Sequence, residues 1–178
     1  MELIKKILPL ILIFNISTTV YSQKIISPDG NFRYSIPYKN ETGADLLKTM
    51  QNINSLIIDI HVLQTKQGKL PLAVSKYEGE ENVPIESLLI KYVNSVKSTS
   101  NSRVLETKSY KKNGMIFHRK ITAIKFNKDN ESICVMFYFK ESRETKYLYE
   151  LKLTSDISDS TEIKKYLENI ASTVTFKK

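Results

Sequence analysis

The dipeptide Asn113-Gly114 constrains the fold of this chain more than any other feature of its sequence. Both central positions of a two-residue hairpin turn need positive φ, which Asn-Gly adopts readily. Strand-like segments flank the dipeptide, which predicts an antiparallel pair over residues 103–112 and 115–126. The turn also fixes the register, in which three pairs lie directly opposite each other: Lys112 and Met115, Tyr110 and Phe117, Lys108 and Arg119.

Further strand and helix patterns lie on both sides of this hairpin. Strands are predicted at residues 24–26, 32–36, 55–64, 70–77, 132–139, 146–153 and 173–176. Helices are predicted at 42–53, from Pro84 onward and from Asp159 onward, because apolar residues recur there three and four positions apart. Pro84 suits a first helical position, and Asp159 followed by Glu162 is similar to a capping box.

This order of elements predicts an α+β fold with a mostly antiparallel sheet flanked by helices. The segment 132–139 is a continuous apolar run, which is typical of a central strand covered on both faces. We therefore expect helices on both sides of the sheet, as in an α/β/α sandwich. No repeat, low-complexity tract or linker divides residues 23–178, which indicates a single domain.

Residues 1–22 have the pattern of a cleaved secretory signal peptide. Lys5 and Lys6 precede an apolar stretch at 7–16, and Val20-Tyr21-Ser22 supplies a cleavage site before Gln23. The alternative is an uncleaved membrane anchor, but a spanning helix needs about 20 apolar residues, and this stretch is near half that length. We therefore predict an exported domain, periplasmic or extracellular, with no transmembrane anchor after cleavage.

The chain offers few residues for metal binding or catalysis. Cys134 is the only cysteine, so neither an intrachain disulfide nor a cysteine-based zinc site can form, and its apolar neighbours predict a buried thiol. The two histidines, His61 and His118, are far apart in the sequence. Nucleotide-binding, hydrolase and metalloprotease motifs are absent. We expect no cofactor, no metal and no enzymatic activity.

The positive charge of the chain is concentrated in the predicted hairpin. The whole sequence has 27 Lys and Arg against 19 Asp and Glu, whereas residues 103–128 hold eight basic residues and only Glu106 as an acid. The candidate anion-binding residues are Lys108, Lys111, Lys112, Arg119 and Lys120. Because Lys108 opposes Arg119, Glu106 or an external anion is expected beside them.

Two interpretations of this basic hairpin remain open. In the first interpretation, the hairpin binds an anionic envelope component or another exported protein. The partner classes are lipid headgroups, acidic polysaccharides and acidic proteins. Nucleic acid is disfavoured, because the protein is predicted to be exported and has few aromatic platforms. Alternatively, its lysines only protect an edge strand from pairing with other chains.

Three segments resemble the PsbP-like superfamily. They are the opening strand and proline at 32–37, the alternating strand at 147–154 and the closing segment at 170–176. Tyr38 stands where a tryptophan often follows the opening proline in that superfamily. The resemblance implies the α/β/α sandwich shared by PsbP and Ran-binding nuclear import factors, and a role in binding or assembly rather than catalysis. It implies neither photosynthetic nor nuclear partners, because no residue here specifies them.

The leading hypothesis is therefore a non-enzymatic binding or assembly protein of the cell envelope. The alternative is a carrier of a small apolar ligand, with a pocket between sheet and helix lined by Tyr and Phe. A weaker alternative is a hydrolase that uses Asp59 and His61, which share one face of the strand 55–64. A partly exposed polar pair without catalytic function is the simpler interpretation of those two residues.

Overall fold

The computed structural model describes seven stretches of the chain, residues 22–66, 68–79, 85–94, 101–112, 114–125, 131–141 and 146–177. Three features named above lie outside the described residues: the predicted signal peptide up to residue 21, Pro84 and Asn113. Within the described stretches, no helix is long and apolar enough to cross a membrane.

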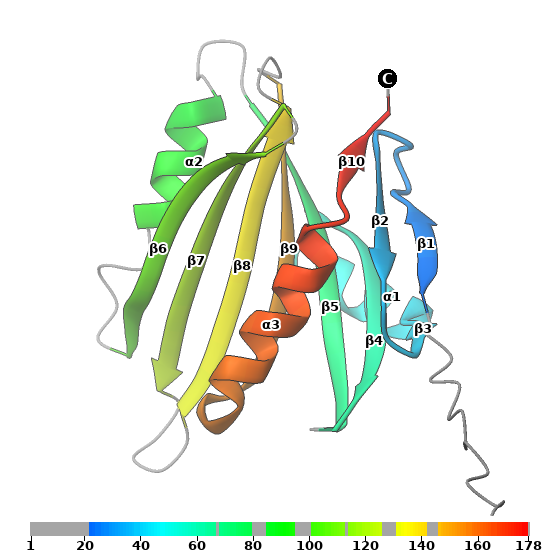
Figure 1. The fold of residues 1–178 in the computed structure, drawn as a ribbon, viewed down its shortest axis with the longest axis vertical. Coiled ribbons are helices and arrows are strands. Elements are labelled where there is room, and N and C mark those ends of the chain that lie inside the picture. The colour runs from blue at the N-terminus through cyan, green and yellow to red at the C-terminus, as the bar shows by residue number, and fades with distance from the viewer. Residues whose placement is uncertain are drawn as a thin grey trace, which may run out of the picture.

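Seven antiparallel strands form a large twisted sheet in the order β3-β4-β5-β9-β8-β7-β6 (Figure 1). Their bounds are β3 (Asn40–Thr42), β4 (Ile57–Thr65), β5 (Gly68–Glu78), β6 (Ser102–Lys112), β7 (Met115–Lys125), β8 (Glu131–Glu141) and β9 (Tyr147–Asp156). All of these strands except the short edge strand β3 correspond to predicted segments. β8, an interior strand of the sheet, is almost entirely buried, as its apolar run predicted.

The hairpin of β6 and β7 has the predicted register. Its three expected pairs are all present: Lys112 with Met115, Tyr110 with Phe117, and Lys108 with Arg119. Gly114 has a φ of 75°, which is the left-handed conformation that the turn requires. The rings of Tyr110 and Phe117 stack with their centroids 5.4 Å apart.

A small sheet and one helix cover one face of the large sheet. The small sheet has the order β1-β2-β10, with β1 at Gln23–Ile26, β2 at Phe32–Ile36 and β10 at Thr175–Phe176. Beside it lies α3 (Ser160–Ala171), which follows a short 3₁₀ turn (Figure 1). Between these layers lies the larger core, in which Phe32 contacts the rings of Phe139, Tyr149 and Phe176.

Two helices cover the opposite face of the large sheet. α2 (Ile85–Asn94) packs Ile85 and Leu89 into a smaller core that also contains Cys134. The thiol of Cys134 is buried, as predicted, and burial raises its pKa. α1 (Ala44–Ile53) lies against β4. The fold is therefore α+β with helices on both faces, which confirms the predicted architecture.

The side chains of β4 depart in part from the predicted alternation. A register shift between Ile57 and Asp59 inserts Ile58 as an extra residue in the strand. Ile57 therefore shares the α1-facing side with Ile60, whereas strict alternation along a strand would put these two residues on opposite sides. The shift is a local change of backbone geometry, which the spacing of apolar residues does not encode.

Candidate functional site

The structure divides the five candidate anion-binding residues into an exposed group and a buried group. Lys108, Lys111 and Lys112 are exposed on β6, which is an edge strand. Arg119 is only 7% exposed and Lys120 is 0% exposed. Arg119 and Lys120 are therefore not available to bind an external anion as predicted, because both belong to β7, which is covered on both faces.

Arg119 is held in a network of ion pairs under α3. Its guanidinium pairs with Glu106 of β6 and with Glu168 of α3. Lys164 of α3 also donates to Glu106, at 2.9 Å. The hydrogen bond from Arg119, together with that from Lys164, lowers the pKa of Glu106. Glu106 thus supplies the negative charge that was expected beside Lys108 and Arg119.

Lys120 points to the other face of the sheet, towards the core under α2. Burial lowers the pKa of its ammonium group, and the nearby carboxylate of Glu150 partly opposes that shift.

The exposed lysines of β6 fit the interpretation of edge protection. β6 also carries a register shift between Val104 and Glu106, and bulges and lysines are both common on protected edges.

Asp59 and His61 do come together, but they are not a surface pair. His61 is 4% exposed, and its Nε2 lies 3.0 Å from Oδ2 of Asp59. The hydroxyl of Tyr34, on β2, donates to the same oxygen at 3.3 Å. Burial raises the pKa of Asp59, but the interaction with His61 and the hydrogen bonds from the backbone of Ile60 and from Tyr34 together outweigh that effect and leave the pKa lowered. This cluster links the small sheet to β4, so the prediction of a partly exposed pair is wrong for His61.

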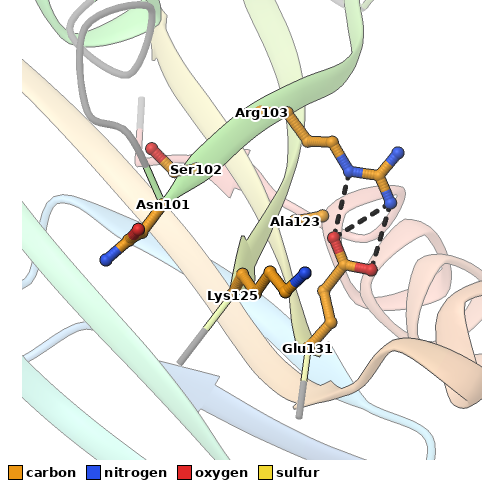
Figure 2. Close-up of a pocket in the computed structure, with 6 residues that line it drawn as sticks. All are labelled: Asn101, Ser102, Arg103, Ala123, Lys125 and Glu131. Atoms are coloured by element: carbon orange, nitrogen blue, oxygen red, sulfur yellow. Dashed lines mark hydrogen bonds and ion pairs between the residues drawn. The ribbon is translucent and has the colours of Figure 1, made fainter. Parts of the chain in front are cut away.

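One hollow lies where β6 and β8 begin and β7 ends. Figure 2 shows its lining residues, with Arg103 and Glu131 facing each other. The guanidinium of Arg103 donates to both carboxylate oxygens of Glu131, at 3.0 and 3.1 Å. The backbone N–H of Lys125 donates to the carbonyl of Asn101 at 2.7 Å. The charged groups of Arg103 and Glu131 are therefore already paired with each other in this hollow.

A second hollow, the α1 cavity, lies between α1 and the large sheet and has a volume of about 260 Å³. Its walls come from α1 and the residues after it, from β4, β5 and β9: Leu46, Met50, Asn54, Ile57, Ile60, Pro71, Ala73, Ser75, Glu150, Lys152 and Thr154. The cavity has an apolar side formed by α1 and β4, and a polar side formed by β9.

The sequence of β5 explains why this space is open. Small residues, Ala73 and Ser75, alternate on the face towards α1, while Leu72 and Val74 face the larger core. Ala73 lies opposite Ile60 on one side and Lys152 on the other. The longer side chains of β4 and β9 therefore extend further towards α1 than the short side chains of β5, and the space above β5 stays open.

Helix α1 spans the cavity without filling it. None of its residues is buried, although its apolar residues Leu46 and Met50 face the sheet. The start of the helix is held tightly, because the N–H of Gly43 donates to the carbonyl of Ile60 at 2.9 Å. A Cβ at Gly43 would lie 2.8 Å from Cγ2 of Ile60, so only glycine fits this approach. Near its end, Gln51 donates to the carbonyl of Ile57 at 2.9 Å.

Glu150 is the buried charged group at the polar side of the cavity. It is 5% exposed, and the hydroxyl of Tyr77 donates to it at 3.2 Å. Burial raises the pKa of Glu150, while the positive charge of Lys152 partly offsets that shift. The cavity therefore combines an apolar wall with a carboxyl, an ammonium and the hydroxyls of Ser75 and Thr154.

The raised pKa of Glu150 predicts a pH-dependent stability. The folded protein holds a proton on this carboxyl more tightly than the unfolded chain does. Its contribution to stability is most favourable below the unfolded pKa of about 4.3 and declines as the pH rises through the folded pKa. Glu150→Gln should therefore be more stable, relative to the unmodified protein, at pH 7 than at pH 4.

Urea unfolding of both proteins at the two pH values measures this difference. Glu141→Gln, at the exposed end of β8, is the matched control and should show a much smaller difference between the two pH values. A stability difference for Glu150→Gln that does not change with pH would contradict the assignment.

The sequence patterns did not predict a site at the residues of the α1 cavity. The spacing of apolar residues predicted α1, and the alternation of β5 predicted a strand. The small residues Ala73 and Ser75 on one face of β5 were the signal that a hollow lies there. The predicted Tyr and Phe lining is wrong for this cavity, because its apolar wall is formed by aliphatic side chains and Met50.

Comparisons with known proteins identify the fold through structure. No protein-family model matches the sequence, and no curated protein matches it either. LpqN of Mycobacterium tuberculosis, described as involved in cell envelope biogenesis, is similar with a TM-score of 0.61 at 7% identity, covering 92% of this chain and 97% of that one. The cyanobacterial PsbP of Synechocystis sp. PCC 6803 is similar with a TM-score of 0.57 at 10% identity, covering 89% and 94%.

The Ran-binding protein Mog1p of Saccharomyces cerevisiae is also similar, with a TM-score of 0.54 at 7% identity, covering 88% of this chain and 95% of that one. Likeness at such low identity shows the fold alone. The chain therefore has the PsbP/Mog1-like fold that its sequence resemblance implied.

Proposed function

We propose that this protein is a non-enzymatic binding protein of the cell envelope that holds a small, mainly apolar ligand in the α1 cavity. The observation that carries the proposal is an amphipathic helix without a single buried residue above an open space of about 260 Å³. An isolated helix of this length is stabilised mainly by packing its apolar face. A ligand in the cavity would complete that packing.

The size and chemistry of the cavity define the class of ligand. A cavity of about 150 Å³ accommodates benzene, so this one suits a molecule of roughly ten to twelve non-hydrogen atoms. The apolar part of such a ligand would contact Leu46, Met50 and Ile60. A hydroxyl or amide at one end would reach Glu150 and Lys152, which offer an acceptor and a donor.

Two further observations support the envelope setting. The signal peptide pattern of residues 1–22 favours export. One protein of the same fold, LpqN, is described as involved in cell envelope biogenesis. The non-enzymatic part of the proposal follows from the buried position of His61, which ties the two sheets together rather than facing a substrate.

The α1 cavity predicts saturable binding of 2-naphthol, an apolar probe of suitable size with one hydroxyl. We expect a Kd on the order of 100 µM, which corresponds to about 0.5 kcal/mol per non-hydrogen atom. Ala73→Leu fills the cavity from its floor and should weaken binding at least tenfold. Isothermal titration calorimetry measures both values.

Ala44→Leu is the matched control, because Ala44 is an exposed residue of α1 that does not line the cavity. It introduces the same side chain and should leave the Kd unchanged. The proposal fails if the unmodified protein shows no saturable binding, or if Ala73→Leu binds as tightly as Ala44→Leu.

A further inference from the structure

The outward face of the small sheet presents a set of basic side chains that the charge pattern of the sequence did not single out. In β2, Phe32 and Tyr34 point into the core and Arg33 points outward. The same alternation puts Lys24 and Ile26 of β1 outward. On the other side of β2, the N–H of Lys177 donates to the carbonyl of Asn31 at 2.9 Å.

We call the exposed side chains on this side the small-sheet face; its members are Lys24, Ile26, Arg33, Thr175 and Lys177. The strand pairing makes them neighbours, because Arg33 lies between Ile26 of β1 and Thr175 of β10. Lys24 lies opposite Ser35, and Lys177 is bonded to Asn31, each two positions along β2 from Arg33. The three cations therefore form a diagonal row across one face of the small sheet.

Within the part of the chain that the structure describes, no carboxylate is paired with this patch. β1, β2 and β10 contain neither Asp nor Glu. Asp29, in the turn between β1 and β2, is paired with Lys76 of β5 at 3.0 Å, on the side of the large sheet. Among the described residues, none forms an ion pair with Lys24, Arg33 or Lys177. The patch differs in this respect from Arg119, whose charge is balanced by Glu106 and Glu168.

A shallow open groove of about 520 Å³ lies on the small-sheet face. Lys24 and Arg33 line it together with the polar residues Ser35, Thr173 and Thr175. Ile26 also lines the groove and is 59% exposed, so its side chain is accessible to a partner. The groove thus combines basic groups, hydroxyl groups and one apolar side chain on the outer face of a sheet.

We propose that the small-sheet face is a contact surface for an anionic phospholipid membrane. Arg and Lys bind lipid phosphates through charge-assisted hydrogen bonds, and each basic residue near an anionic bilayer strengthens binding about fivefold. Ile26 favours a membrane over a soluble anion, because an exposed aliphatic side chain gains by entering the boundary between headgroups and acyl chains. The inner face of β2 is anchored in the core, so the patch is presented on a rigid support.

This inference is independent of the α1 cavity, which lies on the other face of the large sheet. The small-sheet face and the basic hairpin are alternative sites for binding an anionic partner, and two triple variants compare them directly. One variant carries Lys24→Gln, Arg33→Gln and Lys177→Gln. The other carries Lys108→Gln, Lys111→Gln and Lys112→Gln, and so loses the same number of charges from exposed positions.

Co-sedimentation with vesicles tests the proposal, using phosphatidylcholine alone and phosphatidylcholine mixed with phosphatidylglycerol. The unmodified protein should bind only the mixed vesicles, and less at high salt. The small-sheet variant should bind on the order of 100-fold more weakly, and the hairpin variant should bind within about fivefold of the unmodified protein. Ile26→Ser should weaken binding several-fold while leaving the charge unchanged.

Several results would overturn the proposal. They are no binding to mixed vesicles, equal losses in the two triple variants, and a loss confined to the hairpin variant. Displacement of the protein by inorganic phosphate at constant ionic strength, with no effect of Ile26→Ser, would indicate a site for a soluble anion instead. Thermal unfolding of each variant, which should match that of the unmodified protein, shows that a loss of binding is not a loss of fold.

Discussion

Replacing Phe32 by alanine is expected to lower the free energy of unfolding by about 4 kcal/mol. Phe32 is 0% exposed and lies where the small sheet meets the large one, with its ring 4.7 Å from that of Tyr149 and 5.1 Å from that of Phe139. Its removal would leave a cavity lined by aromatic rings, which cannot close without moving β2. Urea unfolding monitored by circular dichroism measures the loss.

Arg33→Ala is the control for this prediction. Arg33 is the next residue of β2, but it is exposed on the small-sheet face, and surface substitutions usually change stability by less than about 0.5 kcal/mol. Similar losses for the two variants would contradict the inward and outward assignment of β2. They would also remove the rigid support proposed for the membrane contact.

Arg119→Ala should destabilise the protein by about 2 to 3 kcal/mol. Loss of one partner from a buried ion pair costs about 3 to 5 kcal/mol. We expect less here, because the side chains of Glu106 and Glu168 are 32% and 40% exposed and keep part of their hydration. The variant loses the link that joins β7 to both β6 and α3, and thermal unfolding measures the effect as a lower Tm.

Lys108→Ala provides the comparison, because Lys108 lies directly opposite Arg119 in the hairpin and is exposed. It should change stability by less than about 0.5 kcal/mol. If Lys108→Ala were as damaging as Arg119→Ala, the distinction between a structural arginine and surface lysines would be wrong.

The fold was predictable to the extent that local signals determined it. Asn113-Gly114 fixed the register of β6 and β7 because a two-residue turn leaves one pairing available. The apolar run of β8 indicated a strand with two covered faces because no polar residue in it could face water. Each of these two patterns can be recognised from a few residues that are neighbours in the sequence.

The candidate sites were less predictable because they depend on contacts between distant segments. The sequence around Arg119 predicted a surface cation, but in the structure Arg119 pairs with Glu168 of α3, which lies 49 residues away in the sequence. Lys120 is buried by elements that the composition of the hairpin does not reveal. The α1 cavity depends on the different lengths of the side chains on three neighbouring strands. The small-sheet face combines residues from the beginning and the end of the domain.

Methyl NMR of the methionines tests the α1 cavity most directly. Met50 lines the cavity, whereas Met115 is buried in the larger core on the other face of the sheet. Titration with 2-naphthol should shift the methyl resonance of Met50 with the Kd found by calorimetry and leave that of Met115 in place. A Met50 signal that does not move while the probe binds, or an equal shift of Met115, would contradict a ligand site beneath α1.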